Sequence, residues 1–241
     1  MGRERLLRLC AWGVHLYTAS GAIAGLFSFE RTARGDFRGA FMLMALTVLI
    51  DSSDGPLARM LAVRERIPEF DGALLDNVVD YLNYVAAPVF LILRAGLIPG
   101  GSGGVALAGF VMLASAYGFC RLDAKTEDHY FRGFPSYWNV VALYLFCIGL
   151  SPRANAIVLA ALAVMVFVPI KYIYPNRTEP LRRLTLALAI VWAVATAAMI
   201  PAIPAPAPFL LYTSLGFVVY YVVMSFALQA YRVAIARRVI G

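Results

Sequence analysis

Residues 39–58 have the sequence GAFMLMALTVLIDSSDGPLA, and residues 72–93 have the sequence GALLDNVVDYLNYVAAPVFLIL. Both stretches are apolar over the roughly 20 residues that a membrane-spanning helix needs, yet each of them carries two aspartates. An aspartate at the centre of a spanning helix costs roughly 2.5–3.5 kcal/mol on insertion scales, so four of them indicate a functional site in a membrane protein. The four aspartates are Asp51, Asp54, Asp76 and Asp80.

The composition of the whole chain supports a membrane protein. Of the 241 residues, 61% are hydrophobic and 15% are charged, whereas a soluble domain carries about 45–50% apolar and about 25% charged residues. The net charge is +7, but the basic residues lie in short clusters between apolar runs. This pattern is typical of membrane topology signals and not of a nucleic-acid-binding face. A water-soluble enzyme and a nucleic-acid partner are therefore excluded.

Six further apolar stretches bring the expected number of spanning helices to eight. We predict an all-α integral membrane protein, a polytopic bundle that forms a single catalytic domain over residues 1–241, with a core over residues 1–174 and an additional helix pair over residues 181–231. The fifth span is short, and a re-entrant segment is the alternative there. The predicted spans are Leu9–Phe29, Gly39–Ala58, Gly72–Leu93, Gly104–Cys120, Ser136–Leu150, Ala154–Tyr174, Leu181–Ile203 and Ala207–Tyr231.

Lysines and arginines in the short connections set the expected orientation, because cytoplasmic loops carry an excess of them. With the N-terminus in the cytoplasm, the inner segments hold 16 basic residues and the outer segments hold 5. Both termini are therefore expected in the cytoplasm. The first outer loop is the exception, since it contains Arg31, Arg34 and Arg38.

Helix geometry places each aspartate pair on one face of its helix. Asp51 and Asp54 are separated by about 60° around the helix axis, and Asp76 and Asp80 by about 40°. If the two consecutive helices pack antiparallel, the carboxylates meet near the cytoplasmic ends. Oxygen ligands without histidine or cysteine favour Mg²⁺ or Mn²⁺, and two such ions suit an attack at phosphorus.

These residues together resemble the sequence signature of the CDP-alcohol phosphotransferase family. The signature here is Asp51-x2-Asp54-Gly55-x2-Ala58-Arg59-x12-Gly72-x3-Asp76-x3-Asp80. The loop between Arg59 and Gly72 is longer than in most members and resembles the bacterial branch of the family that makes phosphatidylcholine. Further stretches that support the resemblance are RLDAKTEDH at residues 121–129, GFPSYWN at residues 133–139 and His15-x2-Thr18-Ala-Ser20-Gly21.

The resemblance implies a reaction, a location and a set of site residues. It implies that the chain is a bacterial inner-membrane enzyme with its active site near the cytoplasmic face. Such an enzyme transfers the phosphatidyl group of CDP-diacylglycerol to choline and releases CMP. By the same resemblance Asp51, Asp54, Asp76 and Asp80 bind Mn²⁺ or Mg²⁺, as two ions, and Asp80 is the general base. The residues that it assigns to CDP binding are Thr18, Ser20, Gly55, Ala58, Arg59 and Gly72.

Other interpretations of these CDP-binding candidates stay open. The small residues among them are also typical of ordinary helix packing, and Arg59 is also typical of a juxtamembrane position. The expected partners include membrane lipids. The sequence does not determine the oligomeric state, and a homodimer is one assembly that it allows.

The alcohol substrate is expected to bind among aromatic residues. Choline carries a quaternary ammonium, which proteins usually recognise by cation–π contact with aromatic rings. A belt of interfacial aromatics is the alternative, and Asp123 or Asp128 could instead pair with the ammonium. The residues of the predicted choline pocket are Tyr130, Phe134, Tyr137, Trp138 and Asn139.

Two alternative functions are retained. The first is the same transfer to serine or another small alcohol. The second is an ion-coupled transporter, whose intramembrane aspartates would form an ion path. Transporters often contain repeated halves, but the acidic stripe occurs once in this chain, which favours the enzyme.

Overall fold

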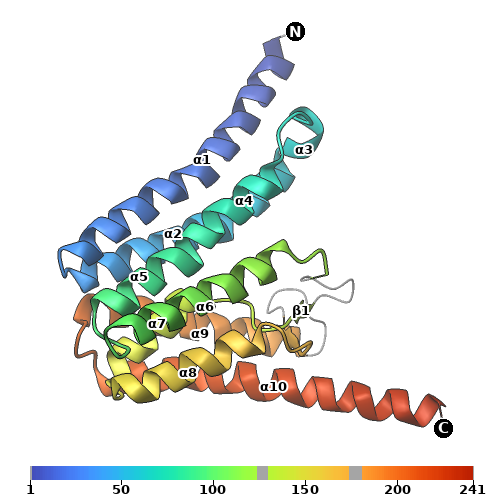
Figure 1. Ribbon diagram of the computed structural model, residues 1–241. Coiled ribbons are helices and arrows are strands. Elements are labelled where there is room, and N and C mark those ends of the chain that lie inside the picture. The colour runs from blue at the N-terminus through green and yellow to red at the C-terminus, as the bar shows by residue number, and fades with distance from the viewer. Residues whose placement is uncertain (1, 124–129, 174–180, 241) are drawn as a thin grey trace. The chain divides into compact units, whose positions relative to one another are not determined.

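The structure is a computed structural model that describes residues 2–123, 130–173 and 181–240. Helices dominate this part of the chain (Figure 1), so the predicted helical class is confirmed, with one small two-stranded sheet as an exception. Asp128 and the end of the predicted sixth span at Tyr174 lie outside the described residues. The elements are α1 (Gly2–Ala33), α2 (Phe37–Met60), α3 (Val63–Arg66), α4 (Gly72–Asp80), the π-helix η1 (Tyr81–Ala86), α5 (Ala87–Arg94), α6 (Ser102–Cys120), β1 (Tyr130–Arg132), α7 (Trp138–Ile148), α8 (Pro152–Met165), β2 (Lys171–Ile173), α9 (Arg182–Met199), the 3-10 helix η2 (Ile200–Ala202) and α10 (Pro208–Ile240).

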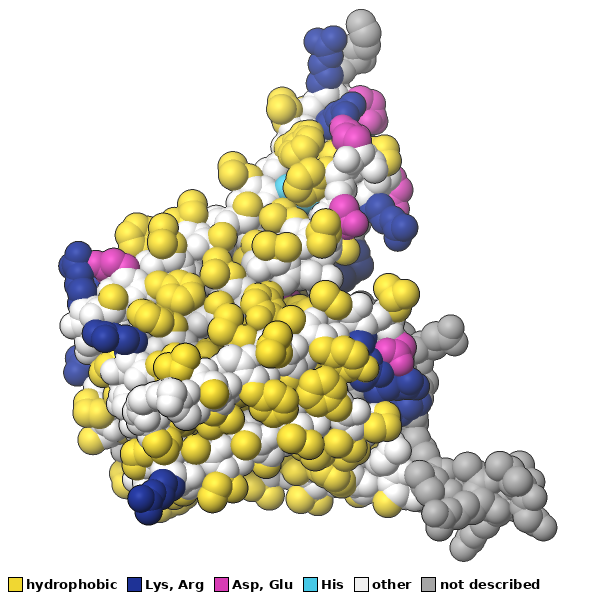
Figure 2. Space-filling view, in the orientation of Figure 1, with side chains coloured by type: hydrophobic (Ala, Val, Ile, Leu, Met, Phe, Trp, Pro, Cys, Tyr) yellow, Lys and Arg dark blue, Asp and Glu magenta, His cyan; other side chains and the backbone are white. Residues whose placement is uncertain are grey.

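Five helical segments in the described ranges are long and apolar enough to cross a membrane. Apolar side chains cover the visible face of the molecule (Figure 2), as a surface in contact with lipid requires. Helices α7 and α8 are apolar but shorter, and the predicted third span is divided between α4, η1 and α5. The number of eight spans therefore stays a prediction. The five segments are Gly2–Ala33, Phe37–Met60, Ser102–Cys120, Arg182–Ala202 and Pro208–Ala230.

The prediction of a sixth spanning helix over Ala154–Tyr174 is wrong in its second half, where the described residues are not helical. Helix α8 ends at Met165, and Lys171–Ile173 forms strand β2, which pairs antiparallel with β1. Pro169 accounts for this change, because proline has no N–H for a helical hydrogen bond and also disfavours helix at the residue before it. In the resulting ribbon Arg132 lies opposite Lys171.

The described chain divides into two compact units. The first comprises the residues up to Leu97 together with Trp138–Leu143, and the second comprises Ile98–Tyr137 together with the residues from Tyr144 onward. All four aspartates of the sequence motif belong to the first unit. The predicted division into a core and an additional C-terminal helix pair stays a prediction.

In the first unit, helix α1 packs along α2 and also contacts α3, α4 and α5. Glycines on α1 allow the close approach. A Cβ atom on Gly21 would lie 2.9 Å from Cγ1 of Val79, and one on Gly25 would overlap the side chain of Asn83. In the N-terminal half of α1, Ala11 and Val14 form a buried cluster with Val63 and Ile67. Helix α1 therefore packs against α4 and η1 through its glycines and against the α3 segment through this cluster.

The three arginines of the predicted first outer loop lie at the end of α1, in the connection and at the start of α2, and this region is less basic than they suggest. Nη1 of Arg31 lies 3.1 Å from Oδ2 of Asp36, and Arg34 forms an ion pair with Glu30. Asp36 is also the N-cap of α2, because its side chain accepts a 2.9 Å hydrogen bond from the backbone N–H of Gly39. Two of the three arginines that oppose the predicted orientation are therefore paired with acids.

In the second unit α6 packs against α8 and α9 packs against α10. Strand β2 is attached to α10 by Ser225, whose hydroxyl accepts a 3.1 Å hydrogen bond from the backbone N–H of Ile173 and donates one to the carbonyl of Tyr221. Trp192 on α9 donates a 3.0 Å hydrogen bond to the hydroxyl of Tyr144 on α7. Polar side chains thus link elements within this unit.

Candidate functional site

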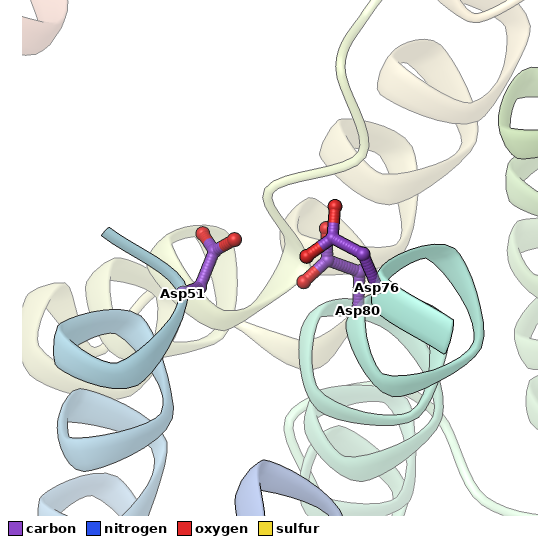
Figure 3. A group of neighbouring side chains, drawn as sticks. All are labelled: Asp51, Asp76 and Asp80. Atoms are coloured by element: carbon purple, nitrogen blue, oxygen red, sulfur yellow. The ribbon is translucent and has the colours of Figure 1, made fainter. Parts of the chain in front are cut away.

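Three carboxylates from two helices form one group. Asp51 lies on α2, while Asp76 and Asp80 lie one turn apart on α4. One carboxylate oxygen from each residue lies within 4.8 Å of those from the other two, and Figure 3 shows the three side chains pointing toward one another. The predicted meeting of the two aspartate pairs is confirmed for these three residues.

Asp54 is directed elsewhere. Its Oδ2 accepts a 2.8 Å hydrogen bond from the hydroxyl of Thr18 on α1, and the carboxylate is buried. The separation of about 60° around the axis of α2 allows Asp51 to face α4 while Asp54 faces α1. Asp54 as a further metal ligand stays a prediction.

The chemistry of the three-carboxylate group fits a divalent cation. All three residues are half-buried, and the group contains neither histidine nor cysteine. Carboxylates held so close together repel one another, and an opposite charge between them favours their ionised form. Hard divalent cations such as Mg²⁺ and Mn²⁺ prefer oxygen ligands of this kind. The group could therefore hold one of these ions.

Tyr84 is a member of the site that sequence reasoning missed. Its hydroxyl donates a 2.7 Å hydrogen bond to Oδ2 of Asp51, and the tyrosine is buried. Tyr84 follows Asp80 by four residues and Asp76 by eight, so it continues the stripe of the two aspartates on their helix. That spacing was a signal in the sequence that could have found it.

The predicted CDP-binding residues on α1 and α2 have varied surroundings. Thr18 bonds Asp54, and Ser20 donates a 2.6 Å hydrogen bond to the carbonyl of Tyr17 in its own helix. Arg59 folds back over its helix, so that its Nη1 would lie 3.4 Å from a Cβ atom placed on Gly55. Ala58 packs against the buried cluster of α1 and α3, which matches the helix-packing interpretation. Their roles in CDP binding stay predictions.

Gly72 is in close contact with a histidine ring. A Cβ atom on Gly72 would lie 2.6 Å from Cε1 of His15. The His15 ring also lies 4.5 Å from the ring of Phe70 and 5.7 Å from that of Trp12, measured between centroids. The histidine is buried, so the glycine admits a packed aromatic group at the start of α4.

The predicted choline-pocket residues lie in both units. Tyr130, Phe134 and Tyr137 belong to the second unit, and Trp138 and Asn139 belong to the first. Nζ of Lys171 lies 5.9 Å from the centroid of the Tyr130 ring, so a cation of the chain itself already lies over this ring. Trp138 is fully buried, and Oδ1 of Asn139 accepts a hydrogen bond from the backbone N–H of Val140. The pocket stays a prediction.

Asp123 already has cationic partners. Arg121 donates two hydrogen bonds to its carboxylate, at 2.8 and 2.9 Å, and Arg132 donates a third at 2.6 Å. The hydrogen bond from Arg121, with the positive charges of Arg121 and Arg132, lowers the pKa of the Asp123 carboxyl. These partners argue against the alternative in which Asp123 pairs with a substrate ammonium.

Fold and site together define a polytopic helical membrane protein with a carboxylate group suited to a divalent ion. No family model matches the chain. It is 45% identical to the phosphatidylcholine synthase of Legionella pneumophila over 170 residues, which are 70% of this chain and 66% of that protein. It is 41% identical to that of Legionella bozemanae over 212 residues, 85% of this chain and 97% of that protein, and 41% identical to that of Borreliella burgdorferi over 183 residues, 76% and 78% of the two chains.

The chain belongs to the phosphatidylcholine synthase family. The predicted resemblance and the prediction of an enzyme are thereby confirmed.

Proposed function

We propose that this chain transfers the phosphatidyl group of CDP-diacylglycerol to choline and releases CMP. The observation that carries the proposal is the group formed by Asp51, Asp76 and Asp80, whose ligand atoms lie within 4.8 Å of one another in a member of the phosphatidylcholine synthase family. A diphosphate substrate needs compensating positive charge at its reacting centre, and this group provides the ligands for it.

The residues of the group have distinct roles in this proposal. Asp51, Asp76 and Asp80 would hold Mn²⁺ or Mg²⁺, and the bound ion would supply positive charge to the diphosphate of CDP-diacylglycerol, from which CMP leaves. Asp80 also takes the proton from the choline hydroxyl. The hydroxyl oxygen then forms a bond to the phosphorus of the phosphatidyl group as the bond from that phosphorus to the CMP oxygen breaks. The proposal includes two such divalent ions at the site.

The remaining predicted contacts and the orientation belong to the same proposal. Thr18, which is hydrogen-bonded to Asp54 three residues after Asp51 on α2, is the CDP-binding candidate with the clearest link to the aspartates. The excess of basic residues in alternate connections supports cytoplasmic termini and a site near the cytoplasmic face of the bacterial inner membrane. A homodimer is the assembly that we would test first in detergent.

The experiment incubates the purified full-length protein with CDP-diacylglycerol, Mn²⁺ and either labelled choline or labelled serine. We expect labelled choline to enter lipid with equal release of CMP, and a chelator to stop both. Asp80→Asn should abolish transfer in a folded protein. Asp71→Asn is the matched control, because Asp71 is the exposed N-cap of the same helix and asparagine caps helices equally well.

Two results would contradict the proposal. Preferential incorporation of serine would favour the alternative alcohol. Near-normal turnover of Asp80→Asn would remove Asp80 from the mechanism.

A further inference from the structure

The hydroxyl of Tyr84 is hydrogen-bonded to a carboxylate of the proposed metal site. The distance from the hydroxyl oxygen to Oδ2 of Asp51 is 2.7 Å, and the tyrosine is 8% exposed. A hydrogen bond to an ionised carboxylate is about twice as strong as one between neutral groups. The contact therefore restrains the rotation of the Asp51 side chain.

The π-helix η1 places Tyr84 on the side of the helix that faces Asp51. In an α-helix each four-residue step passes a full turn by about 40°, so residues spaced by four drift around the axis. A π turn has i→i+5 hydrogen bonds and is wider, so a four-residue step within it no longer adds to that drift. Asp76 and Asp80 precede the π turn, and Tyr84 lies inside it. The side chains of all three residues lie close to the Asp51 carboxylate.

Asn83 fixes the π turn against α1. Its Nδ2 donates a 3.1 Å hydrogen bond to the carbonyl of Gly21, and the side chain is 3% exposed. A Cβ atom on Gly25 would overlap Oδ1 of Asn83, so this glycine leaves the space that the amide occupies. Single π turns inside α-helices occur frequently at functional sites. Here the turn joins the glycine face of α1 to the tyrosine that bonds Asp51.

We propose that Tyr84 is a positioning residue of the metal site. By holding Oδ2 of Asp51, the Tyr84 hydroxyl fixes the orientation in which this carboxylate binds a divalent ion together with Asp76 and Asp80. The inference rests on the proposed function, because it requires that these three carboxylates bind the ion. Removal of a hydrogen-bond partner of a metal ligand typically lowers metal affinity by about 10–100-fold.

The test measures Mn²⁺ binding to the purified full-length protein by the electron paramagnetic resonance signal of the free ion. Tyr84→Phe removes the hydroxyl alone and should weaken Mn²⁺ binding by about tenfold. At saturating Mn²⁺ its turnover should return toward the wild-type value, because the ligands themselves are intact. The matched control is Tyr220→Phe, which removes a hydroxyl bonded at 2.7 Å to Thr185 in the second unit and should leave Mn²⁺ affinity unchanged.

Several outcomes would overturn the inference. Wild-type Mn²⁺ affinity in Tyr84→Phe would do so, and so would loss of folding in the metal-free variant, because the hydroxyl would then act on the fold. In an Asp51→Asn background, Tyr84→Phe should cause no further loss of Mn²⁺ affinity, and an additional loss would show that Tyr84 does not act through Asp51. A wild-type protein that binds no Mn²⁺ removes the proposed metal site as well, whereas wild-type binding with an unaffected Tyr84→Phe overturns this inference alone.

Discussion

Thr18 on α1 donates a 2.8 Å hydrogen bond to Asp54 on α2, and the two residues are 7% and 6% exposed. On the exposed side of the same helix pair, the hydroxyls of Tyr17 and Ser53 are hydrogen-bonded at 2.8 Å. Two adjacent residues of α1 therefore contact two adjacent residues of α2. A buried carboxylate is stable only with such partners, so Thr18 stabilises Asp54 as well as the packing of the two helices.

Thr18→Val should destabilise the protein, because it keeps the shape of the side chain but removes the donor to Asp54. We expect the free energy of unfolding to fall by about 1–3 kcal/mol, as for a buried polar group that loses its partner. Equilibrium unfolding of the purified protein in detergent measures this change. Thr47→Val is the matched control, because the hydroxyl of Thr47 is also buried but donates to the carbonyl of Met44 in its own helix. Equal losses in the two variants would show that the bond to Asp54 contributes nothing specific.

Asp54→Asn and Asp80→Asn should affect Mn²⁺ binding differently. Asp80 belongs to the group whose ligand atoms lie within 4.8 Å of one another, whereas the Asp54 carboxylate is bonded to Thr18. Loss of a ligand should weaken Mn²⁺ binding more than loss of a neighbouring charge, so Asp80→Asn should have the larger effect by more than about tenfold. A titration of each variant with Mn²⁺ provides the comparison. An equal loss in both would support the four-carboxylate site that the sequence predicts.

Local helix arithmetic explains why much of the site could be predicted. Residues spaced by four on one helix share a face, so the meeting of Asp76 and Asp80 followed directly from the sequence. The choice between Asp51 and Asp54 did not, because the rotation of α2 about its axis depends on its packing against both α1 and α4. In the packed structure Asp54 faces α1, where it accepts the hydrogen bond from Thr18.

Two other features could not be predicted from hydropathy. The π turn at Tyr81–Ala86 lies in an apolar stretch with ordinary helical spacing, and the amide of Asn83, which bonds α1, is a tertiary contact. The apolar character of the predicted sixth span continues past Met165, where the helix ends, and Pro169 disfavours its resumption before strand β2. Hydropathy detects what is apolar, but it does not detect where the backbone stops being helical.

Gly72→Ala should be destabilising because of the histidine that packs on this glycine. The added methyl would lie 2.6 Å from Cε1 of His15, which is closer than van der Waals contact allows. Overpacking of this kind typically costs about 1–3 kcal/mol. A lower melting temperature in detergent is the expected readout, and the double variant with His15→Ala should recover part of the loss.

The matched control for this overlap is Gly13→Ala on α1, where a Cβ atom would meet nothing within 4 Å. Alanine is the better helix former, so this variant should be at least as stable as the wild type. If Gly72→Ala melted at the temperature of Gly13→Ala, the contact with His15 would have no energetic consequence.

Asp36 should make the stability of the α1–α2 connection dependent on pH. The backbone N–H of Gly39, followed by the side chain of Arg31, lowers the pKa of the Asp36 carboxyl below its ordinary value. A carboxyl with a lowered pKa in the folded state contributes stability that is complete above its ordinary pKa. That contribution is lost as the pH falls through the lowered pKa. The carboxyl ¹³C chemical shift of Asp36, followed in a pH titration, should report a midpoint below the ordinary value for aspartate.

Two variants separate the charge of Asp36 from its role as a helix cap. Asp36→Asn keeps the hydrogen bond to the N–H of Gly39 without an ionisable group, so the stability advantage of the wild type over it should shrink as the pH falls toward the lowered pKa. Asp36→Ala removes the cap and should cost about 0.5–2 kcal/mol at neutral pH. A wild-type advantage over Asp36→Asn that stays constant down to acid pH would show that the ionised carboxylate adds nothing to the cap, because Asp36 would then titrate identically in the folded and unfolded chains.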